Sequence, residues 1–588
     1  MPWTISADPM GNLLLSAGLA SIPIFYLFWA LAWKRMKGHW ASLSTLGIAM
    51  VIAMVGYGMP MPLATLASLD GAMFGLWPIC WIILPALFIF NLSVKTGDFE
   101  IIKNSLAVIT DDRRIQALLV AFSFGAFIEG CAGFGTPVAI TAAILIGLGF
   151  KPLQAAGICL LANTAPVAFG SIGIPIIVAG QVSGVDTFAI SQMAGRTLPI
   201  ISVFIPFYIV ILLSGWKKGL EVWPAALVCG LSFAIAQFLT ANYLGPMLPD
   251  IIASVSSIIA LGIFLQFWKP KETYTFEDEP AAIGKAQLRF TYGQLLRAWA
   301  PFVILTIFVA GWGIKPLKEL LDHYTLFKIP ITGLHEQVIR DLVPMKAIYN
   351  LNLLSAAGTA VFLAGLCSVF VMRASPKQAV RTFIDSAISM RWPVVSIAAI
   401  IGFAYIMNFS GMASTLGAAF ATTGTMFPFF AAFLGWLGVF MTGSDTSSNA
   451  LFGKLQQETA MRIGIDPVVT VSANTVGGVC GKMISPQTLA VAAATVGMVG
   501  REGDIFRYMI KHSLILTSII AVITYLQAYY LTWMIPEYSS VAVAAGKAMT
   551  QTQDGLIYLS VTLGMAILMT VIARWAGGGN RAVTEKAP

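Results

Sequence analysis

The stretch GAFIEGCAGFGTP at residues 125–137 decides how we expect the chain to fold. It places one carboxyl group, Glu129, inside apolar sequence and follows it with Gly130, Gly133, Gly135 and Pro137. An ionisable side chain at membrane depth is expensive and therefore indicates a functional site. The glycines and the proline predict a turn of the backbone at that depth, with tight helix packing as the competing explanation. No strand precedes the glycines, which excludes a nucleotide-binding loop.

The composition sets the class of protein. Of 588 residues, 57% are hydrophobic and 11% are charged, and the mean hydropathy is +0.82. Soluble domains have roughly a quarter of their residues charged, so the chain is a membrane protein with many spans. The net charge of +8 comes from Lys and Arg in short connectors, which orient a chain in a bilayer and do not indicate a nucleic-acid partner. The six cysteines lie in apolar segments, and we expect them to be buried, with no disulfide, metal or cofactor.

Each span needs about 20 apolar residues. The stretches that meet this requirement are 12–33, 41–57, 72–94, 199–214, 221–240, 250–268, 298–314, 351–372, 389–409, 512–534 and 555–573. Two further regions, 115–190 and 430–500, are interrupted by Gly, Pro, Asn, Thr and Ser, and they predict broken helices or re-entrant hairpins shielded from lipid. The predicted fold class is an all-α polytopic membrane protein with about 12 to 14 transmembrane helices.

The placement of basic residues predicts the orientation. Lys34, Arg35 and Lys37 follow the first predicted helix, whereas 58–70 carries no Lys or Arg. The positive-inside rule then places the N-terminus outside and the basic C-terminal tail inside. The first ten residues lack a basic signal region and a cleavage site, so we expect the first helix to remain in the protein. The connector 315–350 conflicts with this scheme, because it is expected outside and holds five Lys and Arg residues.

The chain also repeats itself. Trp77-Pro78 recurs as Trp392-Pro393, an offset of 315 residues (392 minus 77), and GAFIEG from Gly125 recurs as GVFMTG, an offset of 313 (438 minus 125). ANTAPVAFGSIGIP from Ala162 recurs as ANTVGGVCGKMISP, an offset of 311 (473 minus 162). Basic residues follow the helix at 72–94 but precede its partner at 389–409, which predicts that the two copies are inverted. Inverted repeats with interrupted helices are typical of secondary transporters.

These patterns divide the chain into five parts. They are N-terminal helices at 1–70, a first repeat at 71–195, connecting or scaffold helices at 196–385, a second, inverted repeat at 386–505, and C-terminal helices with a cytoplasmic tail at 506–588.

Four blocks resemble the bacterial lactate permease family, which includes L-lactate and glycolate permeases. They are GAFIEGCAGFGTPVAITAAILIGLGFKP, ANTAPVAFGSIGIPIIVAGQVSG, GWLGVFMTGSDTSSNALF and GKMISPQ, and the resemblance covers about residues 10–535. Cys131 stands where the family is expected to have Ala. The resemblance implies proton-coupled symport of short 2-hydroxymonocarboxylates, L-lactate, D-lactate or glycolate, across the cell inner membrane, with a periplasmic N-terminus and a cytoplasmic C-terminus. The two Asn-Thr pairs more distantly resemble hairpin tips of divalent-anion/sodium symporters, which implies a moving transport domain.

Polar residues at the predicted breaks form the candidate substrate site. A short carboxylic acid with a pKa of about 4 is an anion at neutral pH, and helix N-termini offer it hydrogen-bond donors. We expect the two Asn-Thr pairs to open half-helices, and the polar run at 442–449 to line a cavity or a hairpin tip. The predicted substrate-binding residues are Asn163, Thr164, Thr442, Ser444, Asn474, Thr475 and Lys482. The alternatives are helix capping for the polar side chains and a structural salt bridge from Lys482 to Asp445.

Glu129 and Asp445 are the candidates for proton coupling. A carboxyl group that gains a proton on one side of the membrane and loses it on the other makes the transport of a monoanion electrically neutral. For Glu129, a hydrogen bond within the hairpin and a contact with the substrate hydroxyl are the alternatives. Sodium coupling or carboxylate exchange also stays open, because Asn, Thr and Ser oxygens bind Na⁺ as well. The four histidines are dispersed and no nucleophile lies beside a base, so we expect no enzyme.

Overall fold

The structure is a computed structural model that describes residues 2–34, 36–107, 109–133, 135–276, 291–313, 315–340 and 342–538. Within these ranges, eleven helices are long and apolar enough to cross a membrane, and a bent helix pair brings the number to twelve if it counts as one span. This confirms the helical, polytopic class, at the lower end of the predicted number of spans. The predicted helix at 555–573 and the basic tail lie outside the described residues.

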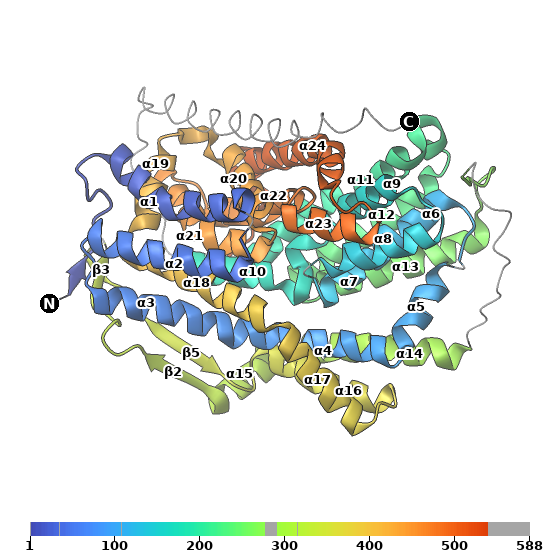
Figure 1. The fold of residues 1–588 in the computed structure, drawn as a ribbon, viewed down its shortest axis with the longest axis horizontal. Coiled ribbons are helices and arrows are strands. Elements are labelled where there is room, and N and C mark those ends of the chain that lie inside the picture. Colours follow the sequence, from blue (N-terminus) through green and yellow to red (C-terminus); the bar gives the residue numbers. More distant parts are fainter. Residues whose placement is uncertain are drawn as a thin grey trace, which may run out of the picture.

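The first helices begin at the N-terminal end of the molecule and continue toward its other end (Figure 1). They are α1 (Leu13–Phe28) with the π-helical turn η1 (Trp29–Trp33), α2 (Gly38–Val55), α3 (Met61–Phe74), η2 (Gly75–Cys80), α4 (Trp81–Lys95) and α5 (Asp98–Ala107). The helical stretch Met61–Lys95 has 35 residues but is kinked at Trp77, whose φ of −135° and ψ of 121° are not helical, so the predicted helix start at residue 72 is wrong. The helix begins earlier because Pro62 fits its first turn and its buried side chains pack on a later helix, α18 (Arg391–Ser410).

A helical hairpin follows, and Glu129 lies near its tip. Its first arm consists of α6 (Arg113–Ala117), η3 (Leu118–Phe124) and α7 (Gly125–Cys131), and its second arm is α8 (Thr136–Gly147). The tip contains Gly133 and Gly135 at φ of 58° and 83°, a left-handed conformation that favours glycine. Pro137 lies in the first turn of α8, where a missing N–H is tolerated. Gly130 lies inside α7 and takes no part in the turn.

The next helix is broken at a proline. α9 (Pro152–Ala162) and α10 (Gly170–Ser183) meet at an angle of 62°, with the short turn η4 (Val167–Phe169) between them. Pro166 follows the Asn163-Thr164 pair and disfavours helix in the residue before it. Ser171, Ile172 and Gly173 then adopt left-handed φ values of 48°, 59° and 72°. The long helix α11 (Thr187–Leu220) completes this first set of elements.

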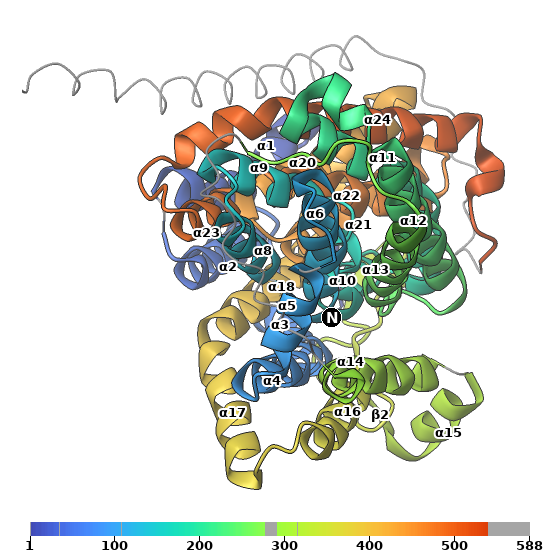
Figure 2. The same ribbon diagram turned by 90° about the vertical axis from the view of Figure 1, so that its right-hand side faces the viewer.

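The middle of the chain holds helices and short strands. These elements are α12 (Trp223–Tyr243), α13 (Pro249–Phe267), α14 (Tyr292–Gly313), α15 (Lys315–Thr325), β2 (Leu326–Pro330), β3 (Val338–Arg340), β4 (Val343–Pro344), β5 (Ile348–Asn352), α16 (Ala357–Val371) and α17 (Pro376–Ser389). The strands were not predicted. β2 pairs antiparallel with β5, and β3 pairs antiparallel with β4 and parallel with the N-terminal strand β1 (Trp3–Thr4). Helices α14 to α17 gather on one side of the molecule (Figure 2).

The second half repeats the order of the first. Its elements are α18, α19 (Met412–Ala421), η5 (Gly424–Met426), α20 (Phe427–Thr442), α21 (Asp445–Ile463), α22 (Pro467–Lys482), α23 (Pro486–Thr495), α24 (Glu502–Tyr529) and η6 (Thr532–Met534). The hairpin of α20 and α21 begins 314 residues after the first hairpin (427 minus 113). α22 begins 315 residues after α9 (467 minus 152), and α24 begins 315 residues after α11 (502 minus 187). The repeat found in the sequence is therefore also a repeat of elements.

The two hairpins open toward different parts of the molecule. At the base of the first hairpin, Arg114 donates hydrogen bonds to Glu221 and to the carbonyl oxygen of Glu272. At the base of the second hairpin, Glu458 accepts a hydrogen bond from Arg340 of strand β3. Figure 1 shows α6 at one end of the molecule, and β3 and α19 at the other. The tips of both hairpins extend from these ends toward the interior.

Candidate functional site

A buried ion pair joins the two repeats. Glu129 on α7 and Lys482, the last residue of α22, lie with Oε1 and Nζ 2.7 Å apart, and their side chains are 3% and 9% exposed. Lys482 lies at a helix C-terminus, where the helix dipole favours a positive charge. The structural salt bridge that the sequence allowed between Lys482 and Asp445 is not formed, because Lys482 donates to Glu129 instead.

The second oxygen of Glu129 is held by the first helix break. Asn163 donates from Nδ2 to Glu129 Oε2 over 2.9 Å. A Cβ atom at Gly170 would lie 2.5 Å from Glu129 Oε1, so the glycine at the start of α10 leaves room for the carboxyl group. Asn163 Oδ1 and Thr164 Oγ1 are buried, and neither has a hydrogen-bond partner among the described residues. With a polar ligand beside the ion pair, the amide oxygen of Asn163 can accept a hydrogen bond, and the hydroxyl group of Thr164 can donate or accept one.

Asn163 occupies a different helix position from the one predicted. It caps the C-terminus of α9, where carbonyl groups end the helix, and does not open a half-helix. The half-helices that begin near the site are instead α8, α10, α21 and α23. Any N–H donors for an anion therefore come from these helices, and not from the helix that carries Asn163.

The second Asn-Thr pair does not lie at a break. α22 runs through Asn474 and Thr475 and ends only at Lys482. The position that matches Pro166 is Gly477, which does not interrupt a helix, and Pro486 comes later. Asn474 Nδ2 and Thr475 Oγ1 both donate to Asn449 Oδ1 of α21, over 2.9 and 3.0 Å, and so fasten the second hairpin to α22. The prediction that this pair opens a half-helix is wrong.

The tip of the second hairpin is shaped by its own hydroxyl groups. Thr442 donates to the carbonyl oxygen of Gly438 over 2.7 Å, and Ser444 caps α21 by accepting a hydrogen bond from the N–H of Ser447. Gly443 between them has a φ of 71°, and a Cβ atom there would lie 2.6 Å from Gln487 Oε1 at the start of α23. The tip therefore lies against the second helix break.

Two further acids lie around the ion pair. Asp445 is the first residue of α21, and Asp250 is the second residue of α13; they are 3% and 1% exposed. In the described part of the chain, neither carboxyl group has a hydrogen-bond partner. Both groups interact electrostatically with Glu129 and with Lys482. Asp445 was predicted from the sequence, and Asp250 was not.

Three other basic residues, two in helices and one in strand β3, belong to the framework. Lys454 and Arg340 both pair with Glu458, and Arg196 donates to Asn242 Oδ1 and to the carbonyl oxygen of Met534, each over 2.9 Å. Five of the six cysteines are buried as predicted, but Cys367 is exposed on α16. Among the residues that the structure describes, no group of three or more His, Cys, Asp and Glu side chains is placed to bind a metal ion.

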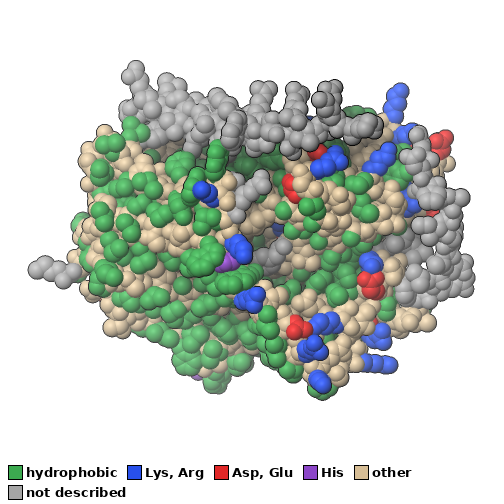
Figure 3. Space-filling model, in the orientation of Figure 1, with side chains coloured by type: hydrophobic (Ala, Val, Ile, Leu, Met, Phe, Trp, Pro, Cys, Tyr) green, Lys and Arg blue, Asp and Glu red, His purple; other side chains and the backbone are tan. Residues whose placement is uncertain are grey.

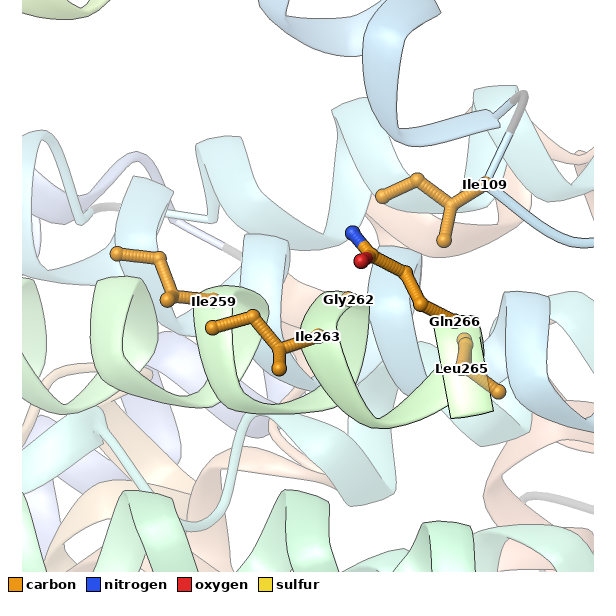
Figure 4. A pocket seen from close by; sticks show the side chains of 6 residues that line it. All are labelled: Ile109, Ile259, Gly262, Ile263, Leu265 and Gln266. Carbon is orange, nitrogen blue, oxygen red and sulfur yellow. The ribbon is translucent and has the colours of Figure 1, made fainter. Parts of the chain in front are cut away.

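One groove on the described part of the chain lies away from the ion pair. It has a volume of about 440 Å³ and is lined by Ile109, Ile259, Gly262, Ile263, Leu265 and Gln266 (Figure 4). Five of these six residues come from α13, on a face that does not include Asp250. Its mostly apolar lining suits lipid, and it contributes none of the charged residues of the candidate site.

Comparison with known proteins identifies the family. The family profile described as L-lactate permease matches residues 16–531. The chain is 51% identical to glycolate permease GlcA of Escherichia coli strain K12, over 91% of this chain and 99% of that protein. It is 50% identical to an L-lactate permease of Bacillus subtilis strain 168 and 49% identical to one of Escherichia coli K12, in each case over 91% of this chain and 100% of the relative.

Among solved structures, MtrF of Neisseria gonorrhoeae aligns with 83% of this chain and 95% of its own, at a TM-score of 0.46 and 13% identity. That likeness is too distant to bear on the fold. The family profile and the curated relatives, by contrast, cover nearly the whole of the described chain. The chain belongs to the L-lactate permease family.

Proposed function

We propose that the protein is a proton-coupled symporter of short 2-hydroxymonocarboxylates. Relatives of about 50% identity are named L-lactate permease or glycolate permease. Lactate and glycolate share a carboxylate and a hydroxyl group on the neighbouring carbon. A permease for such substrates needs a buried cation for the carboxylate and polar groups for the hydroxyl. Lys482, with Asn163 and Thr164 close to its partner Glu129, supplies this combination.

The ion pair between Glu129 and Lys482 carries the proposal, because it supplies a coupling mechanism. A substrate carboxylate and the Glu129 carboxylate compete for the same ammonium group. If the substrate displaced an ionised Glu129 from Lys482, the buried glutamate would be left without a counter-charge, which is strongly unfavourable. A proton on Glu129 removes its charge and frees Lys482 for the substrate. The substrate anion therefore binds together with one proton.

The remaining predicted residues take secondary roles in this proposal. Asn163 Oδ1 accepts a hydrogen bond from the substrate hydroxyl, and Thr164 Oγ1 donates one to it or accepts one from it. Both atoms are available for this role because neither has a hydrogen-bond partner among the described residues. Asp445 is the second candidate for proton coupling. Thr442, Ser444, Asn474 and Thr475 keep the second hairpin in place through their hydrogen bonds, and so act on the substrate indirectly.

We further propose that the repeats are inverted and that the protein lies in the bacterial inner membrane. The bases of the two hairpins at opposite ends of the molecule support inversion. In Figure 3, Lys and Arg side chains gather over the middle and the α6 end of the visible face, and hydrophobic side chains cover the other end. By the positive-inside rule this distribution supports a cytoplasmic α6 end and a periplasmic N-terminus.

The test is uptake of labelled lactate into proteoliposomes with independently imposed gradients. The proposal expects an inward proton gradient to drive accumulation with equal Na⁺ on both sides. Accumulation driven by a Na⁺ gradient at equal pH would replace it with a sodium-coupled symporter. Exchange of internal for external lactate without accumulation under either gradient would make the protein an exchanger.

A further inference from the structure

Asp250 is a buried acid to which the proposed function gives no role. Neither of its carboxyl oxygens has a hydrogen-bond partner in the described ranges. Burying a carboxyl group removes its hydration, and no hydrogen bond to the described residues replaces that hydration. Asp250 therefore ties no elements together in this conformation. A structural role would be served better by an apolar residue or by a group that makes a bond.

The surroundings of Asp250 place it in the candidate site. α13 packs against α7, and a Cβ atom at Gly130 would lie 2.8 Å from Asp250 Cβ, so this glycine allows the acid to approach Glu129. Asp250 interacts electrostatically with Glu129 and Cys131 of α7 and with Lys482 of α22. The other described elements that pack on α13, namely η3, α10 and α12, bring no ionised side chain to it.

The charges of the cluster do not balance. Within the described chain, Lys482 is the one cation that interacts with Asp250 and Asp445, and it already pairs with Glu129. Two further ionised carboxylates would leave the buried cluster with two uncompensated negative charges, which a low-dielectric interior strongly disfavours. Protons on Asp250 and Asp445 remove this imbalance while Glu129 is paired.

The positions of these two acids in the fold separate their roles. Asp445 belongs to the second hairpin and packs against Gly478, one helical turn before Lys482 on α22. Asp445 and Lys482 therefore move together. Asp250 lies on α13, outside the residues predicted to form the two repeats, and faces the first hairpin across an interface between elements. Movement of the hairpin relative to α13 changes the hydration of Asp250 and its distance from Lys482.

We propose that Asp250 is a second proton-binding residue of the transport cycle, so that two protons accompany each monocarboxylate anion. This inference rests on the proposed symport function. On the loading side, one proton forms an O–H bond on Asp250 while Glu129 is still paired with Lys482, and a second then forms an O–H bond on Glu129 as the substrate carboxylate takes over Lys482. On the other side both protons pass to water and the substrate leaves. Each cycle then carries one net positive charge, so that membrane potential contributes to uptake.

The test measures the number of protons per lactate. Full-length protein is reconstituted in proteoliposomes with a fixed lactate gradient. The pH gradient that stops net lactate flux is determined, and so is the potassium diffusion potential that stops it. The wild type is expected to give two protons per lactate, and an inside-negative potential alone should drive accumulation. Asp250→Asn, which imitates the protonated acid, should give one proton per lactate and lose the response to potential. A pH gradient should still drive its uptake.

A matched control isolates Asp250. Asp385→Asn should keep the ratio of two, since Asp385 is exposed on α17 and pairs with Lys95, whose hydrogen bond lowers the pKa of that carboxyl group. Asp445→Asn tests the competing acid, because the inference assigns the second proton to Asp250 and not to Asp445. A wild-type ratio of one, an unchanged ratio in Asp250→Asn, or a loss in Asp445→Asn instead would each overturn the inference.

Two further variants show what a failure of the test would mean. Asp250→Ser serves as a second neutral variant, and misfolding of both neutral variants would make Asp250 structural and overturn the inference. Glu129→Gln distinguishes this failure from a failure of the proposed function. If Glu129→Gln remains fully proton-coupled, the proposed role of Glu129 is wrong, whereas the effect of Asp250→Asn on the ratio is still measured.

Discussion

The ion pair at the centre of the site joins Glu129 and Lys482, which are 353 residues apart in the chain. One partner comes from the first hairpin and the other from the end of α22, so the pair forms only when both repeats are folded and packed. Each charge compensates the other in a buried place. Removing either charge alone therefore has a different effect from removing both.

Glu129→Gln tests the coupling role at this scale. Glutamine keeps the size and hydrogen-bonding capacity of glutamate but cannot release a proton. We expect the variant to lose the proton that Glu129 carries, which lowers the number of protons per lactate by one, while lactate/lactate exchange continues because Lys482 is permanently free for the substrate. Transport assays in proteoliposomes with and without a pH gradient measure both activities. Accumulation with unchanged proton dependence would exclude Glu129 as the carrier and direct attention to Asp445.

Lys482→Ala tests the substrate role. Loss of a charge-assisted hydrogen bond should weaken lactate binding by about 1 to 3 kcal/mol, roughly 5- to 150-fold. The single variant also leaves Glu129 buried without its partner, which should lower stability by about 3 to 5 kcal/mol if the glutamate stays ionised. Addition of Glu129→Gln should restore much of that stability without restoring lactate binding. Thermal unfolding and binding to the purified protein separate these effects, and normal lactate affinity in folded Lys482→Ala would make Lys482 structural.

The sequence identifies Glu129, Asp445 and Lys482 because each interrupts apolar sequence at a predicted break. It does not reveal Asp250, which follows an uncharged connector and opens a helix, where an acid is common because of the helix dipole. Only the packing of α13 against α7 brings Asp250 into the site. The burial of Asp250 depends on tertiary packing, so no local sequence pattern predicts it.

At the scale of elements, the two repeats differ in where their helices break. Glycines and prolines predict that both regions are interrupted, and the structure has hairpins and bent helices there. The sequence match between the Asn-Thr pairs suggests breaks at equivalent positions, but Pro166 has no equivalent after Asn474. The break in the second repeat therefore lies after Lys482, which places the lysine at a helix end and faces it toward Glu129.

Gly135→Ala tests the turn of the first hairpin. Gly135 has a φ of 83°, but an added Cβ atom would meet nothing closer than Val491 Cγ2 at 3.8 Å. The expected loss of about 1 to 2 kcal/mol in stability therefore comes from backbone strain and not from a clash. Gly147→Ala is the matched control in α8, because it has open space and no left-handed φ, and it should be neutral or slightly stabilising. Equal unfolding temperatures for the two variants would contradict a strained tip.

At the scale of the whole molecule, the basic connector 315–350 conflicts with the orientation that the other connectors predict. In the structure this connector forms α15 and the strands β2 to β5, and β3 pairs with the N-terminal strand β1. Arg340 from β3 donates to the backbone and side-chain oxygens of Asn408 and to Glu458. This basic residue holds tertiary structure together, so its place in the sequence follows from packing and need not report the orientation of the chain.

The final prediction concerns the orientation of the two hairpins. If the repeats are inverted, both ends of the first hairpin face the cytoplasm and both ends of the second face the periplasm. Single cysteines at Asp111 and Lys151 flank the first hairpin, and cysteines at Met426 and Arg462 flank the second, all at exposed positions. The background is Cys367→Ser, since the other five native cysteines are buried.

A membrane-impermeant thiol reagent added to intact cells should label Met426→Cys and Arg462→Cys, and should label Asp111→Cys and Lys151→Cys only after the membrane is opened. This outcome follows from geometry, because the two arms of a hairpin run in opposite directions and so bring both of its ends to the same side. Labelling of all four positions from the same side would mean that the repeats are parallel. In that case the two hairpins would not approach the site of Glu129 and Lys482 from opposite sides of the membrane. The alternating access that symport requires would then need another explanation.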